Sequence, residues 1–297
     1  MELISTVKPP SFHYYDPGTV QEAIALLGSL DNAKLLAGGQ SLMPMLNMRY
    51  VLPDHVIDLN RIPELSHIDE SEDRIVIGAM TRQREIERSE FLARRCPIFR
   101  EALIQVGHRQ TRNRGTIGGS LCHLDPAAEL PAVLAALDAT IHVTGPQGSR
   151  EVPIAEFPAF YMTPAIELDE LVTSISFEPW PKGHKSAFVE FARRPGDFAI
   201  VGVAALLATN DAGEVLRAAV TLAGVAAGPV RCSAAEEQLV GPGIDDDSIR
   251  VAAETCRDID AMEDVHAPSS YRQHLAAELV ARAVQAAIDG SGAGLSR

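Results

Sequence analysis

Two glycine-rich segments are the part of this sequence best suited to chemistry. The first reads Ala37-Gly38-Gly39-Gln40-Ser41, and the second reads Thr116-Ile117-Gly118-Gly119-Ser120. Paired glycines let the backbone approach a ligand closely and admit positive φ angles. Successive free N–H groups in such a turn form a concavity that binds anions. Two such segments can hold a pyrophosphate between them, so the pattern predicts a dinucleotide site.

Several common nucleotide-binding and hydrolase motifs do not occur in the sequence. There is no G-x-x-x-x-G-K-[ST], so a P-loop kinase or ATPase is not indicated. A G-x-G-x-x-G following a strand is missing, and so are a G-x-S-x-G elbow and an H-E-x-x-H helix. A dinucleotide would therefore be held by the two separate segments and not by one Rossmann loop.

Composition narrows the range of partners and of compartments. The chain has 297 residues, of which 46% are apolar, enough for two or three domains with substantial cores. The net charge of −14 argues against nucleic acid and anionic lipid as partners. No apolar stretch is long enough to span a bilayer, and Met1-Glu2-Leu3-Ile4-Ser5 lacks the basic start of a secretory signal. We therefore expect a cytoplasmic protein with no membrane span.

The four cysteines are widely spaced along the chain, at Cys96, Cys122, Cys232 and Cys256. None belongs to a C-x-x-C pair, which argues against a zinc or iron–sulfur site within this chain. We expect reduced and mostly buried thiols.

The first glycine segment falls within a short β-α-β pattern. Thr19-Val20-Gln21-Glu22 reads as a capping box at the start of a helix. Strands are predicted at 34–37 and 55–59, with a helix capped by Ser41 over 42–49 between them. The glycines then lie at the carboxyl end of a strand, where α/β folds bind ligands.

The second glycine segment follows a helix predicted from Pro97 to about residue 106 and the basic run Arg109–Arg114. After it, Asp125-Pro126 is predicted to start a helix to about residue 137. The other elements of this part are strands expected at 74–78, 140–143, 150–152 and 171–177, with 145–148 as a hairpin turn between the second and third.

Pro179-Trp180-Pro181-Lys182-Gly183 is the best candidate for a linker. The elements predicted beyond it are strands at 186–192, 200–207 and 215–222, a turn at 210–213, and helices at 234–239, 246–257 and 270–288.

Four ordered segments, at residues 37–42, 112–121, 125–131 and 191–199, resemble the FAD-binding medium subunit of the molybdenum hydroxylases. That family includes relatives of carbon monoxide dehydrogenase and xanthine dehydrogenase. The resemblance covers nearly the whole chain, and four matches in the expected order are far more specific than one glycine loop.

The resemblance implies an α+β fold with a two-part FAD-binding domain over residues 1–178. Its parts would be a small β-α-β unit at about 1–60 and a larger α+β unit at 61–178. An α+β C-terminal flavoprotein domain with a three-stranded antiparallel sheet and helices would follow at 179–290. Residues 291–297 are expected to form a flexible tail.

The resemblance also implies the residues of the cofactor site. Those expected to bind FAD are Leu36, Ala37, Gly38, Gly39, Gln40, Ser41, Leu42, Thr116, Ile117, Gly118, Gly119, Ser120, Asp125 and Glu129. Ser120 stands where the family often has Asn, and it reaches less far. Glu129 stands where relatives often carry Asp. It either accepts a bond from the cofactor or is a solvated carboxylate favoured by the helix dipole. Capping a helix is the simpler role for Asp125.

The resemblance places Phe198 beside the flavin ring, where it would shield the reactive edge. Asp197 would form a hydrogen bond either to the ring or within its own turn. No residue is expected to bind a metal. Arg109, Arg112 and Arg114 would either screen the pyrophosphate, anchor a neighbouring subunit or serve a structural or solvated role. His108 and His123 are expected to pack and not to act as bases.

The function implied is electron transfer. A separate large subunit would carry molybdopterin and oxidise the substrate, and a small subunit would carry two [2Fe–2S] clusters that feed the flavin. The expected assembly is a dimer of heterotrimers. Two alternatives stay open, namely a self-sufficient flavoenzyme of this fold and an assembly subunit that has lost its cofactor. Neither the substrate nor the terminal acceptor is fixed by this chain.

Overall fold

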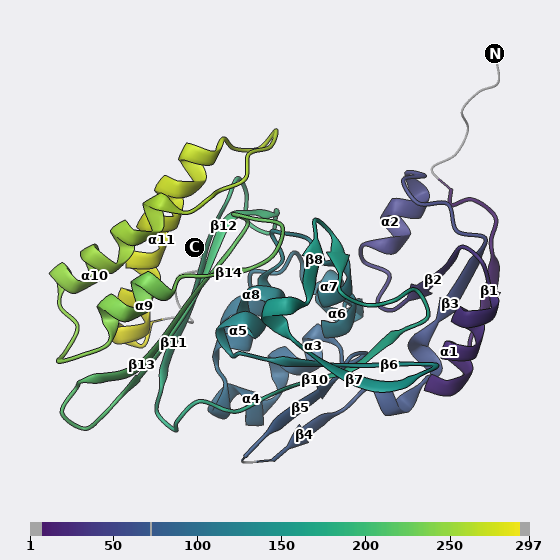
Figure 1. Ribbon diagram of the computed structural model, residues 1–297, viewed down its shortest axis with the longest axis horizontal. Helices are drawn as coiled ribbons and strands as arrows, with labels where there is room; N and C mark the ends of the chain where they lie inside the picture. Colours follow the sequence, from purple (N-terminus) through teal and green to yellow (C-terminus); the bar gives the residue numbers. More distant parts are fainter. Residues whose placement is uncertain (1–7, 72, 292–297) are drawn as a thin grey trace.

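The computed structural model describes residues 8–71 and 73–291, so the predictions on Met1–Ser5 and on most of the tail lie outside the described residues. The chain begins with a small three-stranded parallel sheet in the order β1-β3-β2. Its elements are β1 (His13–Tyr15), α1 (Val20–Ser29), β2 (Ala33–Leu36), α2 (Leu42–Asn47) and β3 (His55–Asp58). Figure 1 shows this unit at the opposite end of the molecule from the C-terminal helices.

The two helices of this unit begin differently from each other. Thr19 accepts a hydrogen bond from the Glu22 N–H at 3.2 Å, which confirms one half of the predicted capping box. The Glu22 carboxylate instead accepts from the Gly18 N–H at 2.7 Å. The prediction that Ser41 caps α2 is wrong, because its backbone is already helical and its side chain makes no capping bond.

A five-stranded antiparallel sheet in the order β4-β5-β10-β6-β7 forms the second unit. The strands are β4 (Ile68–Glu70), β5 (Ile75–Gly78), β6 (Thr140–Gly145), β7 (Gly148–Pro153) and β10 (Leu171–Phe177). The predicted hairpin between β6 and β7 is confirmed, with Gly145 paired to Gly148. A two-stranded ribbon, β8 (Pro158–Phe160) with β9 (Thr163–Pro164), follows it.

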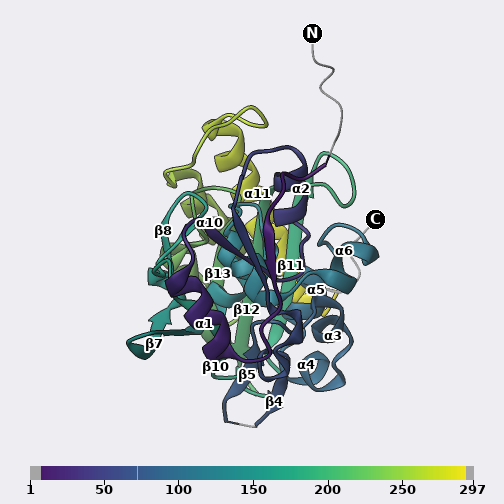
Figure 2. The ribbon, with the colours of Figure 1, turned by 90° about the vertical axis from the view of Figure 1, so that its right-hand side faces the viewer.

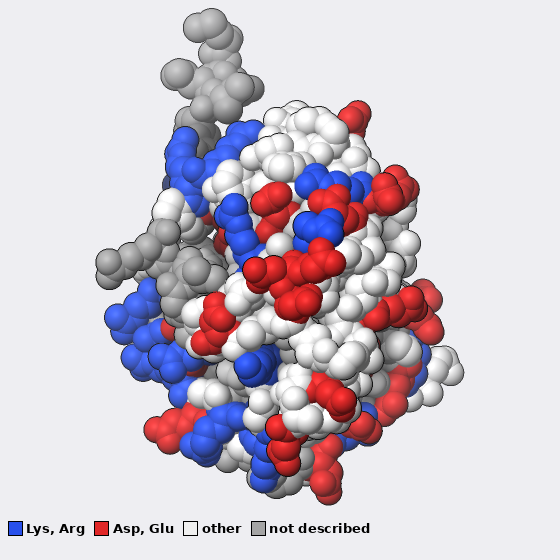
Figure 3. Space-filling model, turned by 90° about the vertical axis from the view of Figure 1, so that its left-hand side faces the viewer, with Lys and Arg blue, Asp and Glu red and all other residues white. Residues whose placement is uncertain are grey.

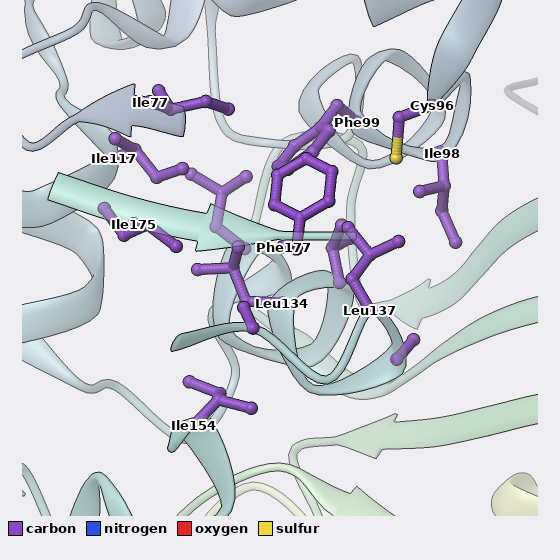
Figure 4. Close-up of a cluster of buried hydrophobic side chains, with 14 of the residues drawn as sticks. Ile77, Cys96, Ile98, Phe99, Ile117, Leu134, Leu137, Ile154, Ile175 and Phe177 are labelled. Atoms are coloured by element: carbon purple, nitrogen blue, oxygen red, sulfur yellow. The ribbon is translucent and has the colours of Figure 1, made fainter. Parts of the chain in front are cut away.

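Six helices lie between β5 and β6 in the chain, and all but α6, which packs on α3, contribute to the buried cluster of Figure 4, where Phe99 and Phe177 meet at a centroid distance of 5.6 Å. They are α3 (Gln83–Arg88), α4 (Glu90–Arg95), α5 (Ile98–Leu103), α6 (Arg109–Arg114), α7 (Ile117–His123) and α8 (Glu129–Ala136). Figure 2 looks onto the N-terminal unit, with α3 to α6 beside it.

Two predictions in this region are corrected. The second glycine segment is not a loop but the first turn of α7, capped by the Thr116 side chain, which accepts from the Gly119 N–H at 3.0 Å. The helix predicted from Asp125 begins only at Glu129. Asp125 instead accepts from the Ala127 N–H at 2.9 Å and closes a turn before the helix.

The C-terminal sheet has four antiparallel strands, in the order β11-β12-β13-β14, and not the three predicted. They are β11 (Lys185–Ala192), β12 (Ala199–Thr209), β13 (Val215–Ala223) and β14 (Val230–Arg231), and the last is too short to show a pattern in the sequence. Helices α9 (Ser233–Leu239), α10 (Asp246–Glu254) and α11 (Ser269–Asp289) cover one face, while α5 and α8 cover the other (Figure 1). Burial on both faces explains the unbroken apolar run of β12.

The outer face formed by α9 to α11 carries acidic and basic side chains interspersed with uncharged ones (Figure 3). In the part of the chain that the structure describes, no helix is long and apolar enough to cross a membrane. All four cysteines are free, and Cys96, Cys232 and Cys256 are buried, as predicted.

Candidate functional site

The two glycine segments lie directly against each other, although they are far apart in sequence. A Cβ placed on Gly38 would stand 2.3 Å from the Arg114 carbonyl oxygen, at the end of α6. One placed on Gly119 would stand 3.3 Å from the Ala37 Cβ and 2.7 Å from the Thr116 Oγ1. At Gly38 the two backbones therefore approach at a distance that only glycine permits, whereas Gly119 lies against side-chain atoms of Thr116 and Ala37.

The first segment offers free backbone donors where an anion-binding turn requires them. Gly39 has φ +73°, the left-handed conformation that turns the chain from β2 into α2. Among the hydrogen bonds within residues 8–71 and 73–291, none uses the backbone N–H groups of residues 38–42. Successive donors of this kind at a helix start suit a phosphate.

The second segment does not offer its backbone in the same way. The N–H groups of Ile117 and Gly118 donate to the Thr81 and Ala79 carbonyls at 3.2 and 2.8 Å, and that of Ser120 donates to the Thr116 carbonyl at 3.1 Å. The expectation that this backbone wraps the pyrophosphate is therefore corrected. Gly119 instead packs against Ala37 of the first segment, and the Ser120 side chain has no hydrogen-bond partner among the described residues.

Two residues that the sequence analysis missed hold the segments together. The Asn60 side chain donates to the Ala37 carbonyl at 3.0 Å, and the Arg82 guanidinium donates both to the Asn60 amide oxygen and to the Arg114 carbonyl. Burial and the nearby Arg114 charge lower the pKa of Arg82. No short motif marks either residue, since each acts through contacts between distant segments.

Glu129 lies near a second half-buried carboxyl group, Glu190 on β11. Burial, and then the proximity of Glu190, raises the pKa of Glu129 to about 8. Burial raises the pKa of Glu190 to about 7, and its Oε2 atom is buried without a hydrogen-bond partner in the described chain. The desolvation of Glu129 argues against the alternative that it is a solvated carboxylate at the start of a helix. Desolvation of both groups and the repulsion between their charges therefore disfavour ionisation of both carboxyls at once.

The loop that carries Phe198 and Asp197 is exposed. Phe198 has 71% of its surface open to solvent, so its ring is free to cover a ligand. Asp197 accepts from the Phe198 N–H at 3.0 Å, which is the local-turn alternative for this residue. A Cβ on Gly196 would lie 3.1 Å from the His108 ring, so this loop reaches the segment just before α6.

The basic run has at least one structural member. Arg112 is only 9% exposed, pairs with Glu87 at 2.9 Å and donates to the Val106 carbonyl at 2.9 Å, so it anchors α6. Arg109 and Arg114 are exposed. Burial lowers the pKa of His123, in keeping with the packing role predicted for it.

A hollow of about 270 Å³ lies elsewhere, between α1 and the five-stranded sheet, and residues such as Glu64, His67 and Thr173 line it. None of the predicted site residues borders it.

Comparison with known proteins identifies the family to which this chain belongs. Residues 10–180 match the FAD binding domain in molybdopterin dehydrogenase, and residues 186–287 match the CO dehydrogenase flavoprotein C-terminal domain. The chain belongs to the family of FAD-binding medium subunits of molybdenum hydroxylases. It is accordingly an oxidoreductase subunit of the carbon monoxide and xanthine dehydrogenase type, as the resemblance implied.

Several members of this family are similar over their whole length. The 6-hydroxypseudooxynicotine dehydrogenase complex subunit alpha of Paenarthrobacter nicotinovorans is 39% identical, over 95% of this chain and 96% of that protein. The carbon monoxide dehydrogenase medium chain of Hydrogenophaga pseudoflava is 36% identical, over 94% of this chain and 98% of that protein. A solved structure of carbon monoxide dehydrogenase from the same organism superposes with a TM-score of 0.90 at 37% identity, over 95% and 98%. The solved structure of quinoline 2-oxidoreductase from Pseudomonas putida 86 superposes with a TM-score of 0.90 at 33% identity, over 96% of this chain and 99% of that chain.

Proposed function

We propose that this chain holds FAD across the junction of its two glycine segments and passes electrons from a partner subunit to an external acceptor. The observation that carries the proposal is the row of free N–H groups at residues 38–42, packed against Gly119 through Ala37. Bound FAD would supply a centre that accepts and releases two electrons. This chain's own residues would bind it, orient it and limit access to it.

Each part of the site has a distinct task in this proposal. Residues 38–42 donate to the pyrophosphate, with Leu36, Ala37 and Leu42 shaping the cradle and Gln40 and Ser41 at its rim. On the facing side, Thr116 to Ser120 contribute a close surface and a hydroxyl. Glu129, whose raised pKa favours the neutral carboxyl group, forms a hydrogen bond to the cofactor. Phe198 covers the ring, and Asp197 shapes the loop that carries it.

The names of the relatives support a place for this chain in a larger complex. Proteins similar to this chain are medium chains or subunits of dehydrogenase complexes, among them carbon monoxide dehydrogenase. We propose a heterotrimer with a large molybdopterin subunit and a small [2Fe–2S] subunit, arranged as a dimer of heterotrimers in the cytoplasm. Substrate oxidation would then take place on the large subunit, and this chain would not contact the organic or gaseous substrate.

The test separates this proposal from a self-sufficient flavoenzyme. The purified chain, loaded with FAD, is mixed anaerobically with carbon monoxide, aldehydes and N-heteroaromatics, and the flavin absorbance is followed. We expect no bleaching by any of them, but bleaching once the complete complex is assembled and given its substrate. Reduction of the flavin in the isolated chain by one of these compounds would overturn the assignment to an electron-transfer subunit.

A further inference from the structure

The loop between β11 and β12, residues 193–198, is exposed along its whole length. An exposed loop does not hold an aromatic ring in one place unless its ends are fixed. Two of its neighbours in sequence, Phe191 before it and Ile200 after it, contact one region of the C-terminal domain, at the start of α11. That region has no role in the site described above.

Arg272 on α11 is the centre of these contacts. It is only 2% exposed, and its Nη1 atom donates to the carbonyls of Ile200 and Gly224 at 2.6 and 2.5 Å. Its Nη2 atom pairs with Asp264 at 2.7 Å. A buried guanidinium is stable only when paired and hydrogen-bonded, so this charge has a strong preference for one geometry. The carbonyl of Ile200, two residues beyond Phe198, is thereby held in place.

Asp264 connects Arg272 to the other end of the loop. Although burial opposes it, bonds from the backbone N–H groups of His266 and Ala267 and from Arg272 lower the pKa of this carboxyl. The turn so formed presents the His266 carbonyl, which accepts from the Arg193 side chain at 2.8 Å. Arg272, Asp264 and the backbone groups that they bind thus form a clamp. This clamp holds the first residue of the loop as well as its far end.

The clamp also reaches the turn that precedes Glu129. Gly224 has φ +78°, and a Cβ there would stand 2.4 Å from the Ile200 carbonyl oxygen, so only glycine lets the two carbonyls converge on Arg272. The N–H group of Gly224 donates to the Pro126 carbonyl at 2.7 Å. One guanidinium thus fixes both the loop of Phe198 and the turn that leads into α8.

We propose that Arg272, with Asp264, is a positioning residue for the flavin, holding in place both the 193–198 loop that carries Phe198 and the 126–129 turn that leads to Glu129. The inference rests on the proposed function for the role of the flavin, but the clamp on the loop stands on the contacts alone. It assigns a task to the start of α11 that no motif in the sequence indicates.

The experiment compares Arg272→Met, Arg272→Lys and Arg193→Gln with the unaltered full chain. Arg282→Met, on the exposed side of the same helix, is the matched control. Hydrogen–deuterium exchange of peptides that cover residues 192–199 is measured without FAD, and FAD dissociation is followed by the recovery of flavin fluorescence. In Arg272→Met we expect exchange and FAD dissociation both to be faster, by about tenfold, because the local opening of the loop becomes easier.

The other variants should change loop exchange and FAD dissociation to different extents. Arg272→Lys retains a charged donor and should recover part of both rates, and the surface variant Arg193→Gln should raise loop exchange without impairing folding. Arg282→Met should match the unaltered chain. A lower melting temperature in Arg272→Met with unchanged loop exchange would overturn the proposal, because Arg272 would then only stabilise the domain. If the unaltered chain binds no FAD, the proposed function fails, while the exchange data still test the clamp.

Discussion

The glycines of the candidate site serve three different physical purposes, although they are the same residue type. Gly39 supplies a left-handed backbone angle, at φ +73°. Gly38 leaves room for the Arg114 carbonyl, and Gly118 leaves room for the Ala79 backbone, 2.7 Å from its ideal Cβ. Gly119 is the one whose missing side chain faces the junction of the two segments. Its substitution therefore tests binding more cleanly than a change at Gly118, which would disturb the core.

Gly119→Ala should weaken FAD binding at least tenfold, or by about 1.4 kcal/mol. The added methyl group would press on the Thr116 hydroxyl and the Ala37 Cβ, separating the two segments. Quenching of flavin fluorescence on titration with the protein measures the dissociation constant. Gly28→Ala is the control, because a Cβ there meets nothing within 4 Å. Equal affinity in both variants would show that the junction does not contact the cofactor.

Glu190→Gln should change the pH dependence of stability. The folded-state pKa values of Glu190 and Glu129 are raised to about 7 and about 8, above the ordinary 4.5. Their contribution to stability is therefore complete below about pH 4.5 and is lost as the pH rises through 7 to 8.

Removal of one of the two ionising groups should leave stability at pH 5 nearly unchanged and raise the free energy of unfolding at pH 9 by about 1–3 kcal/mol. Denaturant unfolding of the FAD-free chain at both pH values measures this. Glu237→Gln, at an exposed position, serves as the control. A gain of the same size at both pH values would mean that Glu190 is not a desolvated acid.

At the scale of the elements, the N-terminal unit and the antiparallel sheet are joined near the site by a bridge of side chains, not by paired strands. Asn60 follows β3, Arg82 precedes α3, and the carbonyls that they hold belong to Ala37 and Arg114. This bridge sets how far apart the two glycine segments stand, and therefore what fits between them.

Asn60→Ala should lower FAD affinity about tenfold while moving the melting temperature by only a few degrees, because a lost side-chain hydrogen bond contributes about 1 kcal/mol and acts mainly on the spacing of the segments. A flavin titration and a thermal melt of the same preparation measure both effects. Asn113→Ala, on exposed α6, should leave both values unchanged. A large fall in melting temperature with intact affinity would contradict this account of the bridge.

The sequence predicts most elements where local signals are strong. The alternation and apolar runs of β10, β11 and β13, and the amphipathic stretch of α11, are confirmed nearly to the residue. Errors arise where a tertiary contact decides. The paired glycines of the run from Thr116 to Ser120 predict a turn with free N–H groups, yet the Thr116 cap and packing against Ala79 make it helical. The two-residue strand β14 forms only because β13 is beside it.

The site follows the same rule. Gly39 and its row of free N–H groups are predictable, since a strand, paired glycines and a helix are all local signals. Asn60, Arg82, Glu190 and Arg272 are not, because each is a common residue type whose role arises from segments far away in the chain. Their burial and partners become visible only when the segments are folded together.

At the scale of the whole molecule, three cores are arranged in series. One lies beneath the N-terminal parallel sheet, a second joins the antiparallel sheet to one face of β11–β14, and a third lies between the other face and α9–α11. Because the second core runs from β5 to β13, the antiparallel unit and the C-terminal sheet share one interior. Glu129 and Glu190 lie at this shared boundary, so the proposed cofactor site would depend on both parts of the chain.

The most direct test of the central claim is the absorbance spectrum of the purified full chain after incubation with FAD and removal of excess cofactor, before and after anaerobic dithionite. The account predicts bands near about 375 and 450 nm, which are general to oxidised flavins, at close to one flavin per chain and bleached on reduction. It also predicts that they are largely lost in Gly119→Ala and retained in Gly28→Ala. A colourless chain, or equal flavin content in both variants, would contradict the claim that the two glycine segments form the cofactor site.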